Sequence, residues 1–193
     1  AVGTEARLNS PGDDTVLGRA VAAVWNLERR SILREDAWNF SVKRARLPQL
    51  AEVPKHTYSA QFQLPADLLK LIEVYGAQRL QYQIEAGKRI LVDGSGPLDI
   101  RYVADIEEPA NFDPAFAKAF ALRVAMGIGN QIAGSAFNEN SVARQYQLAI
   151  NLARSSDAIE NPPIGQEESE WVTSRWSRGG VGSTLGNWED GGA

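Results

Sequence analysis

The amino-acid sequence predicts an α+β fold, in which a helical bundle of three main helices carries an inserted small antiparallel β-domain and an extended C-terminal tail. Apolar residues recur at helical spacing near the N-terminus and again after residue 113, whereas they alternate with polar residues between residues 57 and 106. Glycine becomes frequent after residue 162. The predicted units are residues 1–56 for the first helix and its connection, 57–106 for the β-domain, 107–161 for the rest of the helical domain and 162–193 for the tail.

Length and composition narrow the classes of protein to consider. The chain has 193 residues, of which 44% are hydrophobic and 23% charged, which is typical of a globular protein with one core. Its formal net charge of −4 argues against a general nucleic-acid or acidic-membrane binder, because both need a cationic surface. Cysteine is absent, which excludes disulfides, thiolate metal sites and cysteine nucleophiles. No apolar run approaches the roughly 20 residues that span a bilayer, so no membrane partner is expected.

The first helix is predicted to follow the turn and capping residues at 10–14 and to end near Arg34. Its apolar residues at helical spacing are Leu17, Ala20, Val21, Val24 and Leu27. After it, Trp38 and Phe40 are predicted to be packing residues, because two large aromatic side chains lie in the short connection between helix and sheet. Next come three cations, which form a solvated face or a candidate contact for DNA phosphates or an acidic partner. They are Lys43, Arg44 and Arg46.

Alternating apolar and polar residues between 57 and about 105 predict four or five short antiparallel strands. The next unit is helical again. Asp113 followed by Pro114 predicts the start of a long helix, since aspartate caps helices and proline is favoured at the first position. Gly134 is expected to end this helix, and residues 138–141 to cap a third helix that continues to about Glu160.

The tail is rich both in glycine and in residue types that are common at binding interfaces. From Ile164 onward it holds seven of the 17 glycines and three of the five tryptophans. Such a segment cannot build its own core, yet tryptophan and arginine are the residue types most enriched at binding hot spots. The predicted docking residues are therefore Trp171, Arg175, Trp176, Arg178 and Trp188.

No catalytic, cofactor-binding or metal site is predicted. His56 is the sole histidine and is expected on the surface, so no histidine pair can hold a metal ion. Three pairs of carboxylates, Asp13–Asp14, Glu107–Glu108 and Glu167–Glu168, are adjacent in the sequence, and adjacent residues rarely converge on one point. Gly127 and Gly129 fall within a predicted helix with no strand before it, which is typical of close helix packing and not of a dinucleotide site. The sequence thus favours a protein that is not an enzyme and needs no cofactor.

Six short motifs occur in order along the chain. They are AWNF at residues 37–40, LPADL at 64–68, IRYV at 100–103, DPAF at 113–116, an alanine- and arginine-bearing helix at 149–158 and WVTSR at 171–175. Over about residues 10–176 the chain thereby resembles the tail tubular protein A family, the head-to-tail adaptors of short-tailed bacteriophages. It departs from the family at Ala37, where a proline is frequent, and residues 177–193 match no part of the pattern.

The resemblance implies a structural virion protein of the neck, assembled in the cytoplasm of a bacterial host. In this family a homo-oligomeric ring, of twelve subunits, joins the portal protein to the tail nozzle or tube, and tail fibres are further candidate partners. DNA passes through the channel without sequence-specific binding. In such a ring, we expect the five docking residues of the tail to meet the portal or a neighbouring subunit, an expectation that comes from their residue types and not from the resemblance.

Two alternatives stay open at the level of sequence. The first is a small ligand-binding or accessory domain with its pocket in the β-domain, where four tyrosines could line a cleft. These are Tyr58, Tyr75, Tyr82 and Tyr102. The second is a general protein-binding module.

Overall fold

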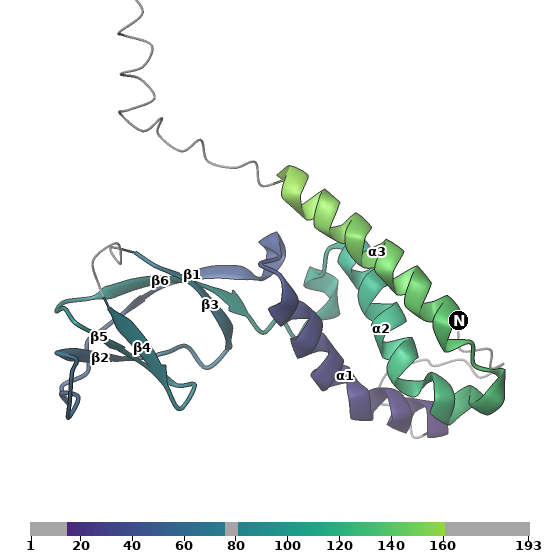
Figure 1. Cartoon of the computed structure of the whole chain (residues 1–193), viewed down its shortest axis with the longest axis horizontal. Coiled ribbons are helices and arrows are strands. Elements are labelled where there is room, and N and C mark those ends of the chain that lie inside the picture. Colours follow the sequence, from purple (N-terminus) through teal and green to yellow (C-terminus); the bar gives the residue numbers. More distant parts are fainter. Residues whose placement is uncertain (1–14, 76–80, 161–193) are drawn as a thin grey trace, which may run out of the picture. The chain divides into compact units, whose positions relative to one another are not determined.

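The structure is a computed structural model that describes residues 15–75 and 81–160, and these residues form a mixed α+β fold (Figure 1). It contains three main helices and two antiparallel sheets of three strands each, with η marking a short 3-10 helix. In chain order the elements are α1 (Val16–Glu35), η1 (Asn39–Ser41), β1 (Val42–Leu47), β2 (Ala60–Gln63), β3 (Leu68–Val74), β4 (Tyr82–Glu85), β5 (Arg89–Val92), β6 (Leu98–Ala104), η2 (Pro109–Asn111), α2 (Pro114–Ala133), η3 (Gly134–Ala136) and α3 (Glu139–Glu160). The chain divides after residue 161 into two units, and all described residues lie in the first.

The predicted helices are confirmed, including their ends. Helix α1 starts at Val16, and its cap is Thr15, the residue directly after the predicted capping segment 10–14; Thr15 Oγ1 accepts a hydrogen bond from the Gly18 amide at 2.9 Å. Helix α2 begins with Pro114, and Asp113 caps it by accepting hydrogen bonds from two backbone amides at 2.8 and 3.2 Å. Gly134 ends α2 with a positive φ of 51°, a conformation that favours glycine. Helix α3 ends at Glu160, as expected.

The strands form two sheets that share one apolar core. Sheet A has the order β1-β6-β3 and sheet B the order β2-β5-β4, and every pairing is antiparallel. The side chains between them include Phe62, Ile90 and Ile100, all at most 1% exposed. Six strands are present where four or five were predicted.

Strand β1 corrects the sequence prediction, which assigned residues 42–47 to the connection of the helical domain. It pairs along its whole length with β6, from Val42 opposite Val103 to Leu47 opposite Leu98. The strand escaped the periodicity analysis because only Ala45 and Leu47 face the apolar core, while charged side chains occupy most other positions. The β-structure therefore starts upstream of residue 57.

A second apolar core holds the helices together, and Trp38 lies at its end. Its side chain is 1% exposed, and its Nε1 donates a hydrogen bond to the Ile32 carbonyl oxygen at 3.1 Å. The indole ring packs edge-on against Phe116, with 5.1 Å between ring centroids, and Phe40 contacts Phe116 from another side at 4.9 Å. The packing role predicted for these two aromatic residues is confirmed.

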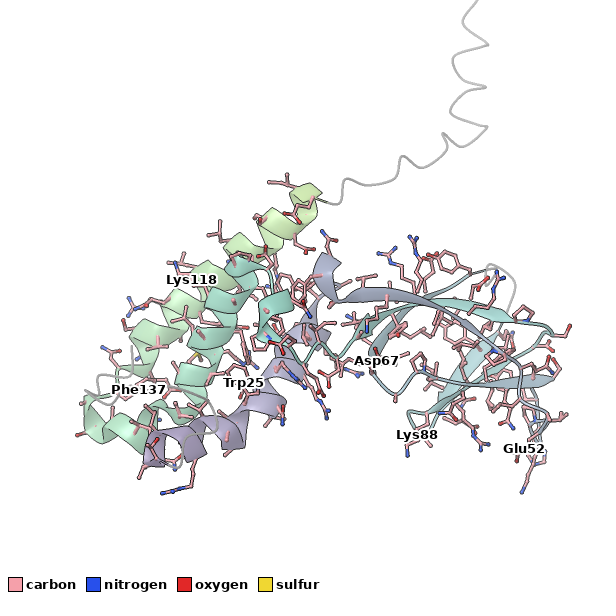
Figure 2. The ribbon with its side chains drawn as sticks, turned by 180° about the vertical axis from the view of Figure 1, so that it is seen from behind. Trp25, Glu52, Asp67, Lys88, Lys118 and Phe137 are labelled. Carbon is pink, nitrogen blue, oxygen red and sulfur yellow. The ribbon has the colours of Figure 1, made fainter. Side chains whose placement is uncertain are left out.

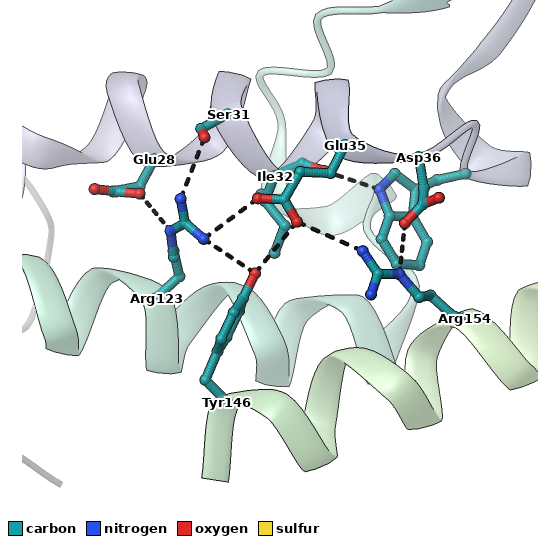
Figure 3. Close-up of polar contacts among 9 residues, drawn as sticks. Glu28, Ser31, Ile32, Glu35, Asp36, Arg123, Tyr146 and Arg154 are labelled. Carbon is teal, nitrogen blue, oxygen red and sulfur yellow. Dashed lines mark hydrogen bonds and ion pairs between the residues drawn. The ribbon is translucent and has the colours of Figure 1, made fainter. Parts of the chain in front are cut away.

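Polar side chains also join the three helices (Figure 3). Arg123 of α2 lies 2.7 Å from Glu28 Oε2, 3.3 Å from Glu35 Oε1 and 3.2 Å from the Tyr146 hydroxyl of α3. Arg154 of α3 makes a 2.6 Å contact with Asp36, at the end of α1. One guanidinium thus connects all three helices, which restricts how α1 and α3 can rotate about α2.

Trp38→Ala should lower the free energy of unfolding by about 3–5 kcal/mol, because it removes a fully buried aromatic side chain and leaves a cavity. Urea unfolding followed by circular dichroism measures this. Leu27→Ala is the matched control: Leu27 is 70% exposed, and its loss should change the stability of the subunit by no more than about 0.5 kcal/mol. Equal unfolding midpoints for Trp38→Ala and the wild type would contradict the packing role.

Candidate functional site

The three cations predicted from the sequence lie on β1, but on its two different faces. Arg44 and Arg46 project from the outer face of sheet A, which points away from the sandwich core, because alternate residues of a strand share a face. Lys43 lies opposite Tyr102 of β6 on the other face. Whether these cations contact DNA or an acidic partner stays a prediction.

Lys43 already has an acidic neighbour within the chain. Its Nζ lies 2.8 Å from Asp67 Oδ2, and the Tyr102 hydroxyl donates to Asp67 Oδ1 at 3.1 Å. Burial disfavours the charged form of Asp67, but the hydrogen bonds from Lys43 and Tyr102 outweigh this, so the pKa of Asp67 is lowered. Burial, together with the hydrogen bond to the Asp67 carboxylate, raises the pKa of Tyr102 to about 12. Lys43 therefore belongs to a cluster within the chain, together with Asp67 and Tyr102.

Arg46 is also paired within the chain. Its guanidinium forms a fork with Asp99, the residue opposite it on β6, with distances of 2.7 and 2.8 Å. The hydrogen bond from Arg46 lowers the pKa of the Asp99 carboxyl group. Both side chains are largely open to solvent, so the pair adds little stability. Its effect is to hold the Arg46 guanidinium in one place.

Arg44 differs from the other two cations of this strand, because it has no acidic partner within the described residues. It lies directly opposite Arg101 of β6, and like charges in this position repel. Arg101 has Glu73 at 4.0 Å, the limit of an ion pair, whereas Arg44 has no acidic partner among residues 15–75 and 81–160. We call Arg44, Arg46 and Arg101 the cationic face of sheet A. An anion bound there would relieve the repulsion between Arg44 and Arg101.

A cavity of about 460 Å³ lies on this outer face. It is lined by Arg44, Ala45, Arg46, Tyr75, Asp99 and Ile100. Two guanidinium groups beside the ring of Tyr75, which is 38% exposed, suit contact with phosphate groups and with a planar group that can stack on the ring. Tyr102 points to the opposite face, into the sandwich core, so the four tyrosines of the sequence prediction do not share one cleft.

The helices carry a second candidate surface, an apolar groove between α2 and α3 with a volume of about 400 Å³. Its lining residues are Lys118, Ala121, Leu122, Ala125, Gln145, Leu148, Ala149 and Leu152. Leu148 and Leu152 are 73% and 61% exposed, although they lie one turn apart on a helix with a well-packed core face. The sequence prediction did not include these two leucines, because they lie outside the apolar stripe of this helix that forms the core. A search for a second apolar stripe on residues 142–153 would have found them.

Helix α1 exposes apolar residues as well. Leu27 is 70% exposed and Val16 is 65% exposed. Leu27 belongs to the predicted apolar stripe of the first helix, yet it lies outside the part of α1 that packs in the helical core. The described part of the chain therefore presents apolar surface on two separate helices.

The chemistry of a catalytic site is not evident in the described residues. His56 is exposed in the loop before β2, as expected. Among the residues with a described position, no three histidine, aspartate or glutamate side chains come together as a metal site. None of the described helices has both the length and the apolar character needed to cross a membrane. The docking residues Trp171, Arg175, Trp176, Arg178 and Trp188 lie outside the described residues and stay predictions.

Comparison with known proteins adds no identification. No protein-family model matches the chain, and a search of curated proteins finds no match.

Substitution of the cationic face by glutamine, in the triple variant Arg44→Gln, Arg46→Gln and Arg101→Gln, should weaken binding to a DNA oligonucleotide. The slope of log K against log salt concentration should become shallower by up to about 3, about 1 for each lost phosphate contact. Fluorescence anisotropy at several salt concentrations measures both quantities. The control variant replaces Lys55, Lys88 and Arg89, which lie outside this face. Equal losses of DNA affinity in both variants would show that binding depends on the net charge of the chain and not on the cationic face of sheet A.

Stability should fall between about pH 10 and pH 12 because of Tyr102. In the unfolded chain Tyr102 ionises near pH 10, whereas in the folded chain it stays protonated up to about pH 12. Its contribution to the free energy of unfolding is therefore complete below pH 10 and is lost as the pH rises through 12. The loss amounts to at most about 1.4 kcal/mol per pH unit. Urea unfolding at several pH values measures it. Tyr102→Phe should lack this part of the decline; an identical pH profile would refute it.

Proposed function

We propose that this chain is a structural virion protein, a subunit of the head-to-tail adaptor ring that joins the portal to the tail nozzle or tube of a short-tailed bacteriophage. It acts by assembly and catalyses no reaction. In this proposal the three helices form the bundle that builds the ring, and the strands between α1 and α2 form a domain inserted into it. The order of the six sequence motifs suggested this function.

The observation that carries the proposal is the exposure of large apolar side chains on two different parts of the helical region. Leu27 projects from α1, whereas Leu148 and Leu152 border the groove between α2 and α3. Leu148 and Leu152 line a groove, and an apolar surface of this kind is common at protein interfaces, whereas Leu27 is a single exposed leucine between exposed arginines on α1. A closed ring needs two different, mutually complementary faces on each subunit, and we propose the groove between α2 and α3 as one of them.

The cationic face of sheet A fits the same function. The net charge of −4 keeps most of the chain from holding DNA tightly, while Arg44 and Arg101 offer a local site for phosphate groups. Arg46 is already neutralised by Asp99, which limits the strength of such a contact. Weak contact with the backbone and no base recognition suit DNA that moves through a channel.

The proposal includes the partners that the resemblance implies. They are the portal protein, the tail nozzle or tube protein, further copies of this chain in a ring of twelve, tail fibres as candidates, and DNA in passage. Residues 171–188 supply the tryptophan and arginine anchors for the portal or the adjacent subunit. The location is the neck of a virion assembled in the cytoplasm of a bacterial host.

Multi-angle light scattering tests the proposal. The full chain alone should remain a small species, and addition of the portal protein encoded by the same phage genome should convert it into a large ring-shaped complex. Electron microscopy of that complex gives the number of subunits. A chain that stays monomeric with the portal present, or that binds a small metabolite in the cavity at Tyr75, would contradict an adaptor function.

A further inference from the structure

We propose that the cavity on the outer face of sheet A binds single-stranded nucleic acid, with one unpaired base stacked on Tyr75 and the adjoining phosphate groups held by cations of the same face. This inference goes beyond the adaptor function, because the site lies within one subunit and does not depend on a ring. Binding requires no particular base, since every base offers a flat face for stacking.

Strand pairing places cations and an aromatic ring side by side on this face. Arg46 pairs with Asp99 across β1 and β6, and the Tyr75 amide donates to the Asp99 carbonyl oxygen at 2.9 Å, so these three residues form one row across the sheet. Arg44 and Arg101 belong to the next row. Rows on one face are about 6.6 Å apart and strands about 4.8 Å apart, which puts the Cα atoms of Arg101 and Tyr75 about 8 Å from each other. In a nucleotide the sugar separates the phosphate from the base, and this spacing allows for it.

The phosphate position is the pair formed by Arg44 and Arg101. The two residues lie directly opposite each other, and the structure shows no acidic partner for Arg44 within residues 15–75 and 81–160. Glu73 lies 4.0 Å from Arg101, and Asp99 holds Arg46 in a fork, so one of the three arginine charges remains uncompensated. A phosphate group between Arg44 and Arg101 would offset this charge and their repulsion, because a guanidinium group can donate two parallel hydrogen bonds to phosphate oxygens.

A further cation continues the path away from Tyr75. Lys70 of β3 pairs with Val103, two residues along β6 from Arg101, and it is exposed with no acidic partner in the part of the chain that the structure describes. Along the sheet the order is therefore Tyr75, then Arg44 with Arg101, then Lys70. A strand with several phosphate groups can contact both cationic positions at once, which favours a nucleic-acid chain as the ligand.

Tyr75 is the reason to expect an unpaired strand. Its side chain is 38% exposed and lines the cavity together with Arg44 and Arg46. The bases of a duplex stack on one another, so a duplex could bring only its phosphate groups to this face. An unpaired base can lie flat on the tyrosine ring, and such stacking raises affinity by about 5-fold or more. A glutamate-rich peptide could meet the arginines, but it has no flat group for the ring.

Fluorescence anisotropy of the full chain at low salt tests the site, with a labelled single strand of about 15 nucleotides and the duplex of the same length. The single strand should bind more tightly than the duplex. Tyr75→Ala should weaken single-strand binding by about 5-fold or more and leave duplex binding unchanged, whereas Tyr75→Phe, which keeps the ring, should retain it. Tyr82→Ala is the matched control, because Tyr82 is 45% exposed on β4 of sheet B and does not line the cavity.

The cations have their own pair of variants. Arg44→Gln should weaken the binding of single strand and duplex alike, because both contact it through phosphate groups. Lys88→Gln removes the same charge elsewhere and should change neither affinity. Lys88, labelled in Figure 2, lies in the turn between β4 and β5 of sheet B.

Four results would overturn the site. They are no measurable binding of the single strand, a duplex that binds as tightly as the single strand, an unchanged single-strand affinity in Tyr75→Ala, and a glutamate-rich peptide of equal charge that displaces the strand at equal concentration. Each of these results leaves the adaptor function standing, because ring assembly is measured separately with the portal protein. Failure of the chain to form a ring would overturn the adaptor function and leave this site standing.

Discussion

The position of the β-structure relative to the helices depends on the ion pair between Arg29 of α1 and Asp105, the first residue after β6. Arg29 Nη2 lies 2.9 Å from Asp105 Oδ1, and the two side chains are only 3% and 8% exposed. Burying a charged side chain away from water costs free energy. Arg29 and Asp105 offset this cost only while they remain in contact, so the pair opposes any separation of β6 from α1. Arg30 makes a second contact with Asp105, and the Asp105 amide donates to the Asp67 carbonyl oxygen. The end of β6 is thereby held against α1.

The position of α2, and with it the set of helical residues left on the surface, depends on this junction between α1 and β6. The chain leaves Asp105 through η2 and enters α2 at Pro114, where Phe112 and Phe116 pack on the aromatic side chains beside Trp38. Helix α2 contacts both other helices, and Arg123 links them through hydrogen bonds. With its buried sides fixed in this way, the helical region has to leave Leu27 and the groove beside Leu148 on its surface.

In the proposed adaptor, the two parts of the chain have different roles. The apolar surfaces of the helices would serve assembly, and the cationic face of sheet A would meet a polyanion or an acidic partner. Of the three cations predicted from the sequence, Arg44 and Arg46 share this face, whereas Lys43 belongs to the cluster with Asp67 and Tyr102. The sequence alone could not show that Lys43 lies on a different face from Arg44 and Arg46. Side chains of adjacent residues point to opposite faces in a strand, and residues 42–47 were not predicted to form one. Arg101 joined the face through pairing of β6 with β1, more than 50 residues away in the chain.

By itself the sequence determined the three helices, their caps at Asp113 and Gly134, the burial of Trp38 and the mixed α+β class. These features depend on spacing and on local hydrogen bonding, which can be read over a few consecutive residues. Strand β1, the pairing of Arg44 with Arg101 and the exposure of Leu27, Leu148 and Leu152 were decided only by the tertiary structure. A helical stripe shows that a face is apolar, but whether another helix covers that face depends on contacts between residues far apart in the chain.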